Sequence, residues 1–196
     1  MKLLNSKTYL NLAKAYAGET QARTRYEFIE YGARMQGLKA LADLIQKVTM
    51  NEFNHARMLY SFIQTADTGI IANIDIASGY PFKEKWNLLD NLKLAAEDET
   101  EEEKRIYPEY GKIAKQEGFD DIEGLFDNLV QVESCHRKLF TQLYEQMRDG
   151  TMYKKPKSVK WKCGDCGFEH EGKEAFAECP LCHAKQGVFL LKINDE

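Results

Sequence analysis

The chain has 196 residues, of which 43% are hydrophobic and 30% charged, and its formal net charge is −4. This length predicts one or two domains, and the composition is typical of a soluble globular protein. The modest negative charge gives no electrostatic reason to expect a nucleic acid or an anionic membrane as a partner. No segment approaches the roughly 18 apolar residues of a membrane span, and no apolar region of a secretory signal follows Met1, so a cytoplasmic location is expected.

The first three-quarters of the chain follow a helical pattern, with few prolines and with apolar residues at three- and four-residue steps. Residues 66–85 break this pattern and are too many for an ordinary helix–helix turn. A connection of that length suits the crossover of a ferritin-like four-helix bundle, which joins parallel helices. Gly37, Gly118 and Gly150 stand where three helices should end. We therefore expect a bundle domain over 1–150, with helices near 5–35, 38–65, 86–117 and 120–149.

The C-terminal part of the chain has a different character. Residues 151–157 are expected to form a linker, and 158–196 a small domain of turns and short strands that cannot bury a sufficient core unaided. This domain holds two C-x-x-C units, Cys163, Cys166, Cys179 and Cys182. In a cytoplasmic chain such paired units indicate a metal site rather than disulfides. Four thiolates suit zinc or iron, and their spacing does not distinguish the two metals.

Acidic residues interrupt the apolar stripe of every predicted helix, at positions that should face the core. Together with two histidines they are Glu19, Glu52, His55, Glu99, Glu102, Glu133 and His136. Five carboxylates and two imidazoles cannot neutralise one another in a dry core, whereas two divalent cations can. A glutamate on each of two helices and Glu-x-x-His on each of the others is the two-metal arrangement of ferritin-like bundles.

Other polar residues are expected to be less important. Among the remaining acids of the run 97–103, four should form a solvated face: Glu97, Asp98, Glu101 and Glu103. Tyr26 and Tyr107 are equally compatible with core aromatics and with hydrogen-bond donors to a ligand or a bound oxygen species. Cys135 should be a small core residue rather than a ligand, and His170 and His183 should lie on the surface.

These motifs resemble the rubrerythrin family over the whole chain, in the form with an N-terminal ferritin-like bundle and a C-terminal rubredoxin-like domain. The segments that carry the resemblance are residues 17–26, Glu52-Phe-Asn-His55, Glu99-x-x-Glu102 followed by Tyr107-Pro108, Glu133-Ser-Cys-His136 and the two cysteine units. The resemblance implies two iron ions in an oxo- and carboxylate-bridged bundle site, and one iron held by the four cysteines. It also favours a role for both tyrosines beside the metals. Two positions depart from the family pattern, where glycine is common: Asp98 and His183.

The resemblance also implies a mechanism, in which hydrogen peroxide is reduced to water at the two irons. Glu52 and Glu133 would bridge them, and Glu99 and His136 would complete one iron's ligands. The other iron would bind Glu19 and alternate between Glu102 and His55 with its redox state, and Tyr26 and Tyr107 would hydrogen-bond near the reacting oxygens.

Electrons would come through the cysteine-bound iron, from a rubredoxin or an NAD(P)H-dependent reductase. The implied role is protection from oxidative stress in an anaerobe-type cytoplasm. Because helices of this size are about 40 Å long at 1.5 Å per residue, a head-to-tail dimer would bring one chain's cysteine site near its partner's di-iron site. An iron-storage ferroxidase, a di-iron oxygenase, and a zinc ribbon on a structural metal bundle are the alternatives.

Overall fold

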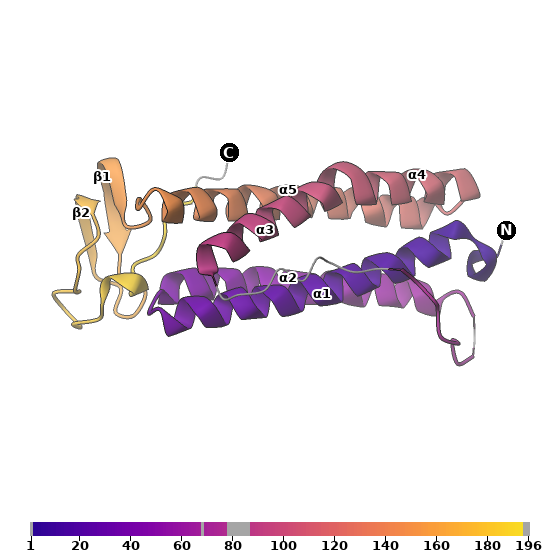
Figure 1. Ribbon diagram of the computed structural model, residues 1–196, viewed down its shortest axis with the longest axis horizontal. Helices are drawn as coiled ribbons and strands as arrows, with labels where there is room; N and C mark the ends of the chain where they lie inside the picture. Colours follow the sequence, from indigo (N-terminus) through magenta and orange to yellow (C-terminus); the bar gives the residue numbers. More distant parts are fainter. Residues whose placement is uncertain (1, 68, 78–86, 194–196) are drawn as a thin grey trace.

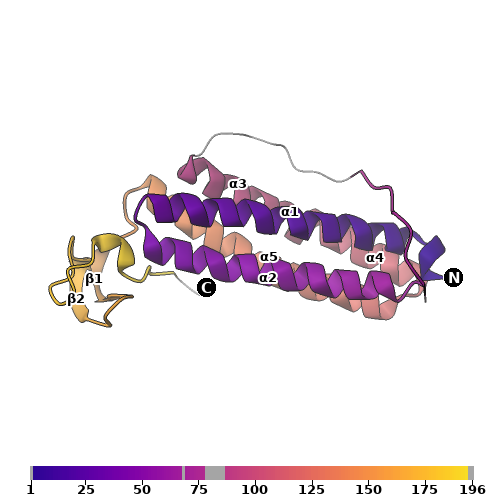
Figure 2. The same cartoon turned by 90° about the horizontal axis from the view of Figure 1, so that it is seen from below.

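A computed structural model describes residues 2–67, 69–77 and 87–193 of the chain. Two antiparallel helical pairs run lengthwise beside each other and form a four-helix bundle (Figures 1 and 2). The first pair consists of α1 and α2, and a short 3-10 turn, η1, precedes it. In the second pair, the continuous rod of α3, η2 and α4 packs against α5. The bounds are η1 (Leu3–Asn5), α1 (Lys7–Met35), α2 (Lys39–Gln64), α3 (Leu88–Glu101), η2 (Glu102–Ile106), α4 (Tyr107–Glu117) and α5 (Asp120–Arg148).

The predicted ferritin-like bundle is confirmed, and so are its helix ends. Gly37, Gly118 and Gly150 have φ values of 73°, 84° and 64°, in the left-handed region that glycine adopts most easily. In Figure 1, α2 ends near the N-terminus of the chain, whereas α3 begins at the opposite end of the bundle. The connection between them therefore crosses the length of the bundle, as predicted. Residues 68 and 78–86, which include the expected start of the third helix, lie outside the described residues.

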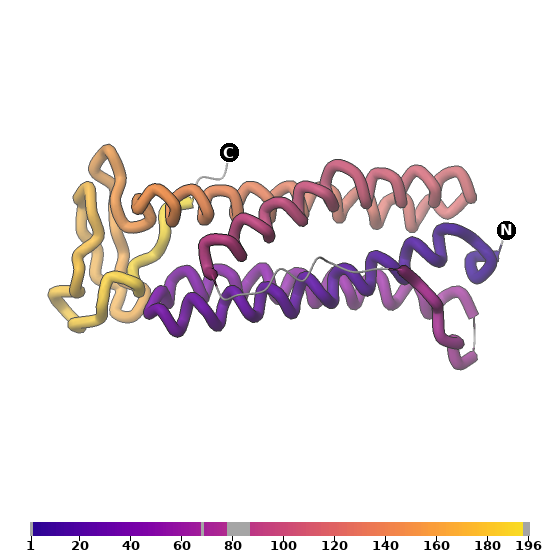
Figure 3. Tube along the Cα trace, viewed as in Figure 1, coloured from indigo at the N-terminus to yellow at the C-terminus, as the bar shows by residue number. Residues whose placement is uncertain are grey.

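The third predicted helix contains a π-helical turn that the sequence analysis does not anticipate. This turn, η2, joins α3 to α4 without interrupting the rod (Figure 3). A π turn adds one residue to the helical repeat, so the side chains beyond it are rotated relative to those before it. As a result Tyr107 rather than Ile106 is fully buried, with 1% of its surface exposed.

The apolar core of the bundle is divided into two clusters along its length. One cluster lies towards the α1–α2 turn and contains Leu41, Ile45, Leu92, Phe140 and Leu143. The other lies towards the N-terminus and contains Leu12, Leu59, Tyr107, Ala114 and Phe126. The predicted metal ligands occupy the helical turns between these clusters, so apolar packing on both sides holds their backbone in place.

The C-terminal domain contains a two-stranded antiparallel sheet, β1 (Lys154–Lys162) and β2 (Glu169–Glu174), and a 3-10 turn, η3 (Gln186–Val188). Residues 154–157, expected in the linker, thus belong to a strand. Two of the five residues buried at the domain's centre are large aromatics, Trp161 and Phe189. Each helix within the described part of the chain is too short or too polar to span a lipid bilayer.

This domain is packed against the end of the bundle (Figure 1). Lys39 Nζ lies 3.4 Å from a carboxylate oxygen of Asp165. Gly187 faces the α1–α2 turn so closely that a Cβ atom there would lie 1.9 Å from the carbonyl oxygen of Gly37. Only glycine can occupy position 187 in this arrangement.

Candidate metal centres

Carboxylates and imidazoles from all four rods of the bundle converge between its two apolar clusters. The structure brings together two overlapping groups whose ligand atoms lie within 4.8 Å of one another. The members of the first group are Glu19, Glu52, His55 and Glu133, and those of the second are Glu52, Glu99, Glu133 and His136. Both groups include Glu52 and Glu133, which come from the facing Glu-x-x-His motifs of α2 and α5. Because the two groups share these carboxylates, their geometry is that of two adjacent metal positions.

The carboxylates of these groups are almost completely removed from water. Glu19 and Glu133 are 0% exposed, and Glu52 and Glu99 are 1% exposed. Oxygens of all four make no well-oriented hydrogen bond within the described part of the chain, and their nearest cationic neighbours are the two imidazoles. Four anionic carboxylates with only two imidazoles beside them are costly in a dry interior unless cations neutralise them. The donor set of oxygens and imidazole nitrogens fits divalent iron.

The electrostatics of the group follow from this crowding. Burial and the neighbouring charge of Glu52 raise the pKa of Glu19 well above its usual value. Burial likewise raises the pKa of Glu99 to about 8. Burial opposes the charging of His55, but Glu133, Glu19 and Glu52 outweigh it and raise its pKa to about 12. Glu19 and Glu99 therefore hold their protons to a higher pH than ordinary glutamates do, unless metal ions replace those protons.

Two tyrosines donate hydrogen bonds to the two carboxylates that are not shared between the ligand groups, and each bond joins the two halves of the bundle. Tyr26 of α1 donates its hydroxyl hydrogen bond to Glu99 on α3, and Tyr107 of α4 donates to Glu19 on α1. The two halves of the bundle are thus related by an approximate two-fold axis. Tyr26 follows Glu19 by seven residues, whereas Tyr107 follows Glu99 by eight. The π turn η2 supplies the additional residue, and without it Tyr107 would point away from Glu19.

Glu102 also faces inward, since it is only 4% exposed. It is the first residue of η2. It is not a member of either ligand group among the described residues, and the first group is completed by His55 instead. In this structure His55, rather than Glu102, lies within 4.8 Å of the other ligand atoms of the first group.

Three expectations about neighbouring residues are wrong. Asp98 and Glu103 are half-buried rather than solvated, because they form ion pairs with Arg25 and Arg137. Cys135 is exposed, not a core residue. It lies two residues after Glu133 on α5, and the helical repeat of about 100° per residue turns it away from the core.

The four cysteines of the C-terminal domain also meet. Their sulfur atoms form one potential metal-binding group, with Cys163 Sγ at 3.8 Å from Cys182 Sγ and Cys166 Sγ at 3.6 Å from Cys179 Sγ. Although burial opposes it, backbone N–H groups of Cys182 and Leu181 lower the pKa of Cys179 to about 7. Backbone hydrogen bonds oppose it, but burial and neighbouring thiols raise the pKa values of Cys166 and Cys182 in the absence of a metal, so Cys179 deprotonates more readily than either. The arrangement fits a four-thiolate iron.

The two histidines of this domain differ. His183 is exposed, as expected, and its φ of 62° lies in the left-handed region, which glycine adopts more easily than any other residue. His170 is half-buried rather than on the surface, because its ring stacks on Phe176 with the ring centroids 4.0 Å apart. Neither belongs to the four-sulfur group.

Comparison with known families matches both parts of the chain. The rubrerythrin family model matches residues 11–144, and the model of the rubrerythrin rubredoxin-like domain matches residues 161–189. The chain belongs to the rubrerythrin family. It is similar to the rubrerythrin of Clostridium perfringens, with 36% identity over 187 residues that cover 95% of each chain. To the rubrerythrin of Nitratidesulfovibrio vulgaris it is 31% identical over 193 residues, 98% of each chain.

Solved structures agree with this family assignment. Fully reduced, all-ferrous nigerythrin aligns with a TM-score of 0.62 and 25% identity, over 98% of this chain and 94% of that one. A bacterioferritin from Desulfovibrio desulfuricans aligns with a TM-score of 0.60 over 73% of this chain and 81% of its own, but at 18% identity it supports the fold alone. This rubrerythrin-family chain therefore has a di-iron carboxylate–histidine site and a four-cysteine rubredoxin-like iron site.

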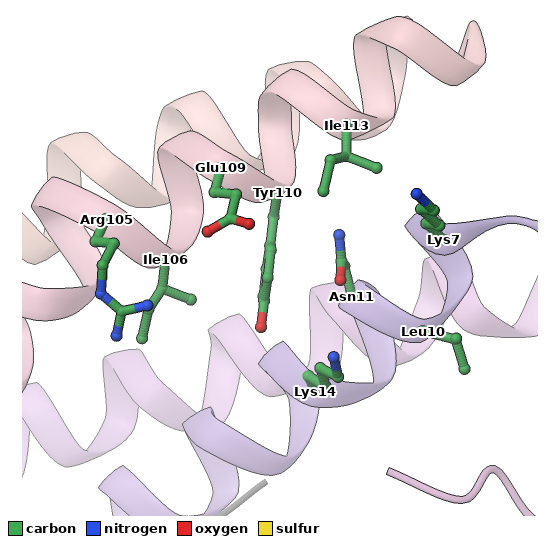
Figure 4. A pocket seen from close by; sticks show the side chains of 9 residues that line it. All are labelled: Lys7, Leu10, Asn11, Lys14, Arg105, Ile106, Glu109, Tyr110 and Ile113. Carbon is green, nitrogen blue, oxygen red and sulfur yellow. The ribbon is translucent and has the colours of Figure 1, made fainter. Parts of the chain in front are cut away.

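A separate cavity of about 340 Å³ lies between the start of α1 and the rod formed by η2 and α4 (Figure 4). Its lining includes Lys7, Lys14 and Arg105. Arg105 is already paired with Glu101 at 2.7 Å. No member of the two bundle groups lines this cavity, so it is separate from the metal centre.

Proposed function

We propose that this rubrerythrin-family protein is a peroxidase that reduces hydrogen peroxide to water, with electrons delivered through its rubredoxin-like iron. The observation that carries the proposal is the pair of overlapping, buried ligand groups in the same chain as a four-thiol domain. An iron-storage protein does not need a one-electron carrier of its own. The reaction consumes one peroxide, two electrons and two protons and forms two water molecules.

The ligand groups suggest which residues hold each ion. Glu52 and Glu133 belong to both groups and would be shared between the two irons. Glu99 and His136 would complete one position, and Glu19 with His55 the other. When iron is bound, the pair supplies two electrons, one from each ion, and the four-thiolate iron supplies electrons singly.

Glu102 is proposed as the alternate of His55 at the Glu19 position. It is buried at the start of the π turn, and its carboxylate favours ferric iron, whereas the neutral imidazole of His55 suits ferrous iron. A protein that alternates in this way has two arrangements of its own side chains, one for each redox state.

Tyr26 and Tyr107 are the proposed hydrogen-bond donors beside the reacting oxygens. Burial, together with the negative charges of Glu99 and Glu52, raises the pKa of Tyr26 well above its usual value, so its hydroxyl keeps its proton. Both hydroxyls already donate into the ligand group, to Glu99 and Glu19. They orient these carboxylates and hold protons within the buried site.

The electron route is proposed to cross between two copies of the chain. The four-cysteine domain is packed at the α1–α2 turn, where Asp165 pairs with Lys39. Glu52 lies 13 residues further along α2, which is about 20 Å at 1.5 Å per residue. A head-to-tail dimer would place the domain beside a partner's bundle site, with an NAD(P)H-dependent reductase or a rubredoxin as the donor. A strictly monomeric protein with full reductase-coupled turnover would contradict this route.

Stopped-flow mixing of the fully ferrous protein with hydrogen peroxide or with dioxygen tests the proposed activity. We expect oxidation by peroxide to be the faster reaction, with one peroxide consumed per two electrons. Faster oxidation by dioxygen would favour a ferroxidase or an oxygenase instead. The visible spectrum adds a control, because ferric tetrathiolate iron is red whereas a zinc-loaded ribbon is colourless.

A further inference from the structure

The two imidazoles of the bundle are held differently on the side that faces away from the carboxylates. Nδ1 of His136 points into the group, 2.8 Å from an oxygen of Glu133 and 2.9 Å from one of Glu52. Nε2 of the same ring lies 3.2 Å from the side-chain amide of Asn51. Asn51 reaches His136 across the seam between α2 and α5, so one residue from the opposite helix fixes the outer edge of this ring.

His55 lacks a comparable anchor. Its Nδ1 lies 3.2–3.3 Å from oxygens of Glu19, Glu52 and Glu133, but no residue within 2–67, 69–77 and 87–193 bonds to its Nε2. Its side chain is also more exposed than that of His136, at 12% against 5%.

The approximate two-fold axis explains this asymmetry in terms of sequence. Asn51 immediately precedes Glu52 in the Glu-x-x-His motif of α2. The residue that immediately precedes Glu133 in the equivalent motif of α5 is Val132. Valine has no side-chain donor or acceptor, so the position that corresponds to Asn51 cannot anchor His55.

We infer that Asn51 is a positioning residue that makes His136 the constant imidazole of the metal centre, while Val132 leaves His55 able to move. The inference rests on the proposed ligand assignment but not on peroxide as the substrate. It provides a physical basis for the proposed alternation at the Glu19 position, because only the ring without an outer anchor can leave its metal at little cost.

Asparagine suits this position because its amide can both donate and accept. When Nδ1 of His136 faces carboxylates and carries the proton, Nε2 is an acceptor for the amide N–H of Asn51. When the lone pair of Nδ1 binds a metal, Nε2 carries the proton and needs an acceptor. A rotation of the amide by half a turn then presents the oxygen of Asn51 in place of its nitrogen. Partners of this kind on a metal-bound histidine commonly change metal affinity by about 10- to 100-fold.

The test is a titration of the metal-free full-length protein with Co²⁺, followed by visible absorption. Thiolate-to-cobalt absorption separates the cysteine site from the two bundle positions. For the parent protein we expect two unequal bundle affinities. In Asn51→Leu, the tighter affinity should fall by about 10- to 100-fold, whereas Asn51→Asp, which retains an acceptor for Nε2–H, should restore it.

Two further variants complete the design. Asn54→Leu is the matched control, because Asn54 is also exposed on α2 but donates only to the carbonyl of Met50. It should leave both bundle affinities within twofold of the parent. Val132→Asn should tighten the weaker affinity by supplying the missing partner of His55. The inference is overturned if Asn51→Leu changes the tighter affinity no more than Asn54→Leu does, or if Asn51→Asp fails to restore it. Neither result depends on whether the loaded protein reduces peroxide.

Discussion

The bundle buries its metal ligands between two apolar clusters, whereas the C-terminal domain uses its ligands as part of a very small core. Glu19, Glu52, Glu99 and Glu133 are nearly inaccessible, yet packed side chains on both sides support their helices. In the C-terminal domain, two of the five residues at the centre are the ligands Cys163 and Cys179. The comparison teaches that the ligands of a metal site can destabilise one fold in its metal-free form and be part of the core that another fold requires. The bundle should tolerate loss of its metals, and the small domain should not.

The largest expected effect is therefore loss of the C-terminal fold when a buried cysteine is removed. Cys179→Ala takes away both a ligand and part of the core, and a structural four-cysteine metal site contributes on the order of 10 kcal/mol. Limited proteolysis should show rapid cleavage within residues 154–193, while α1, α2 and α5 of the bundle remain resistant. The matched control is Cys135→Ala, an exposed cysteine outside both metal sites, which should resist as the parent does. Equal protection of the domain in both variants would contradict the comparison.

A smaller effect is expected at the contact between the two regions. In Gly187→Ala the new Cβ would meet the backbone of Gly37, which cannot move aside as a flexible side chain can. Overpacking of this kind costs about 1–3 kcal/mol, so the domain should leave the α1–α2 turn while keeping its own metal. Small-angle scattering should report a larger radius of gyration. Gly172→Ala is the control, because its Cβ would make only ordinary contacts of 3.5 Å or more. Identical scattering from both variants would show that the domain is not held at this contact.

Because buried carboxylates destabilise the metal-free bundle, replacing one of them should raise its free energy of unfolding. Glu19→Gln removes one carboxylate from a crowded group and keeps an oxygen that can accept from Tyr107. We expect the metal-free protein to gain about 1 kcal/mol of unfolding free energy at neutral pH, since burial raises the pKa of Glu19 and the folded chain must hold a proton there, whereas glutamine is neutral without one. The same variant should bind one of the two bundle metals more weakly. Urea unfolding and metal titration measure the two effects. A metal-free variant less stable than the parent would mean that Glu19 stabilises the bundle by itself.

The smallest effect concerns the end of the bundle remote from both metals. Glu117 accepts hydrogen bonds from the backbone N–H of Lys7 and Thr8 and from the Thr8 hydroxyl, at 3.0, 2.8 and 2.6 Å. Burial opposes ionisation, but the bonds from Thr8 and Lys7 outweigh it and lower the pKa of Glu117. Glu117→Gln should cost about 1 kcal/mol at neutral pH, as loss of a helix cap does.

The pH dependence of that cost follows from the direction of the shift. A pKa lower in the folded than in the unfolded protein stabilises above the usual glutamate value, and the contribution is lost as the pH falls through the lowered pKa. Urea unfolding at pH 7 and pH 3 should therefore show a smaller difference between parent and Glu117→Gln at pH 3. Glu97→Gln, at an exposed ion pair with Lys93, should show little difference at either pH. A gap that grows at pH 3 would contradict the assigned role.

The sequence by itself determined the bundle, its crossover and the chemistry of both metal sites. Apolar spacing alone assigns the four rods, and only metals reconcile Glu19, Glu52, Glu99 and Glu133 with positions that face a core. These features could be predicted because helical periodicity is local, and because paired motifs such as Cys163-x-x-Cys166 specify their own geometry. The expectation that Cys135 lies in the core was wrong, because it followed the usual burial of a free cysteine rather than the helical repeat, which turns this residue outward.

What only the tertiary structure decided depends on contacts between distant segments. The π turn at 102–106, which brings Tyr107 to Glu19, leaves no local signature in the periodicity before it. The ion pairs of Asp98 and Glu103 required knowing which arginines lie opposite them. The difference between His136 and His55 depends on Asn51 and Val132, which lie on two facing helices. Asn51 and its partner His136 are 85 residues apart along the chain. The helical repeat determines which face of a helix a residue occupies. The packing of the helices against one another determines which partner that residue contacts.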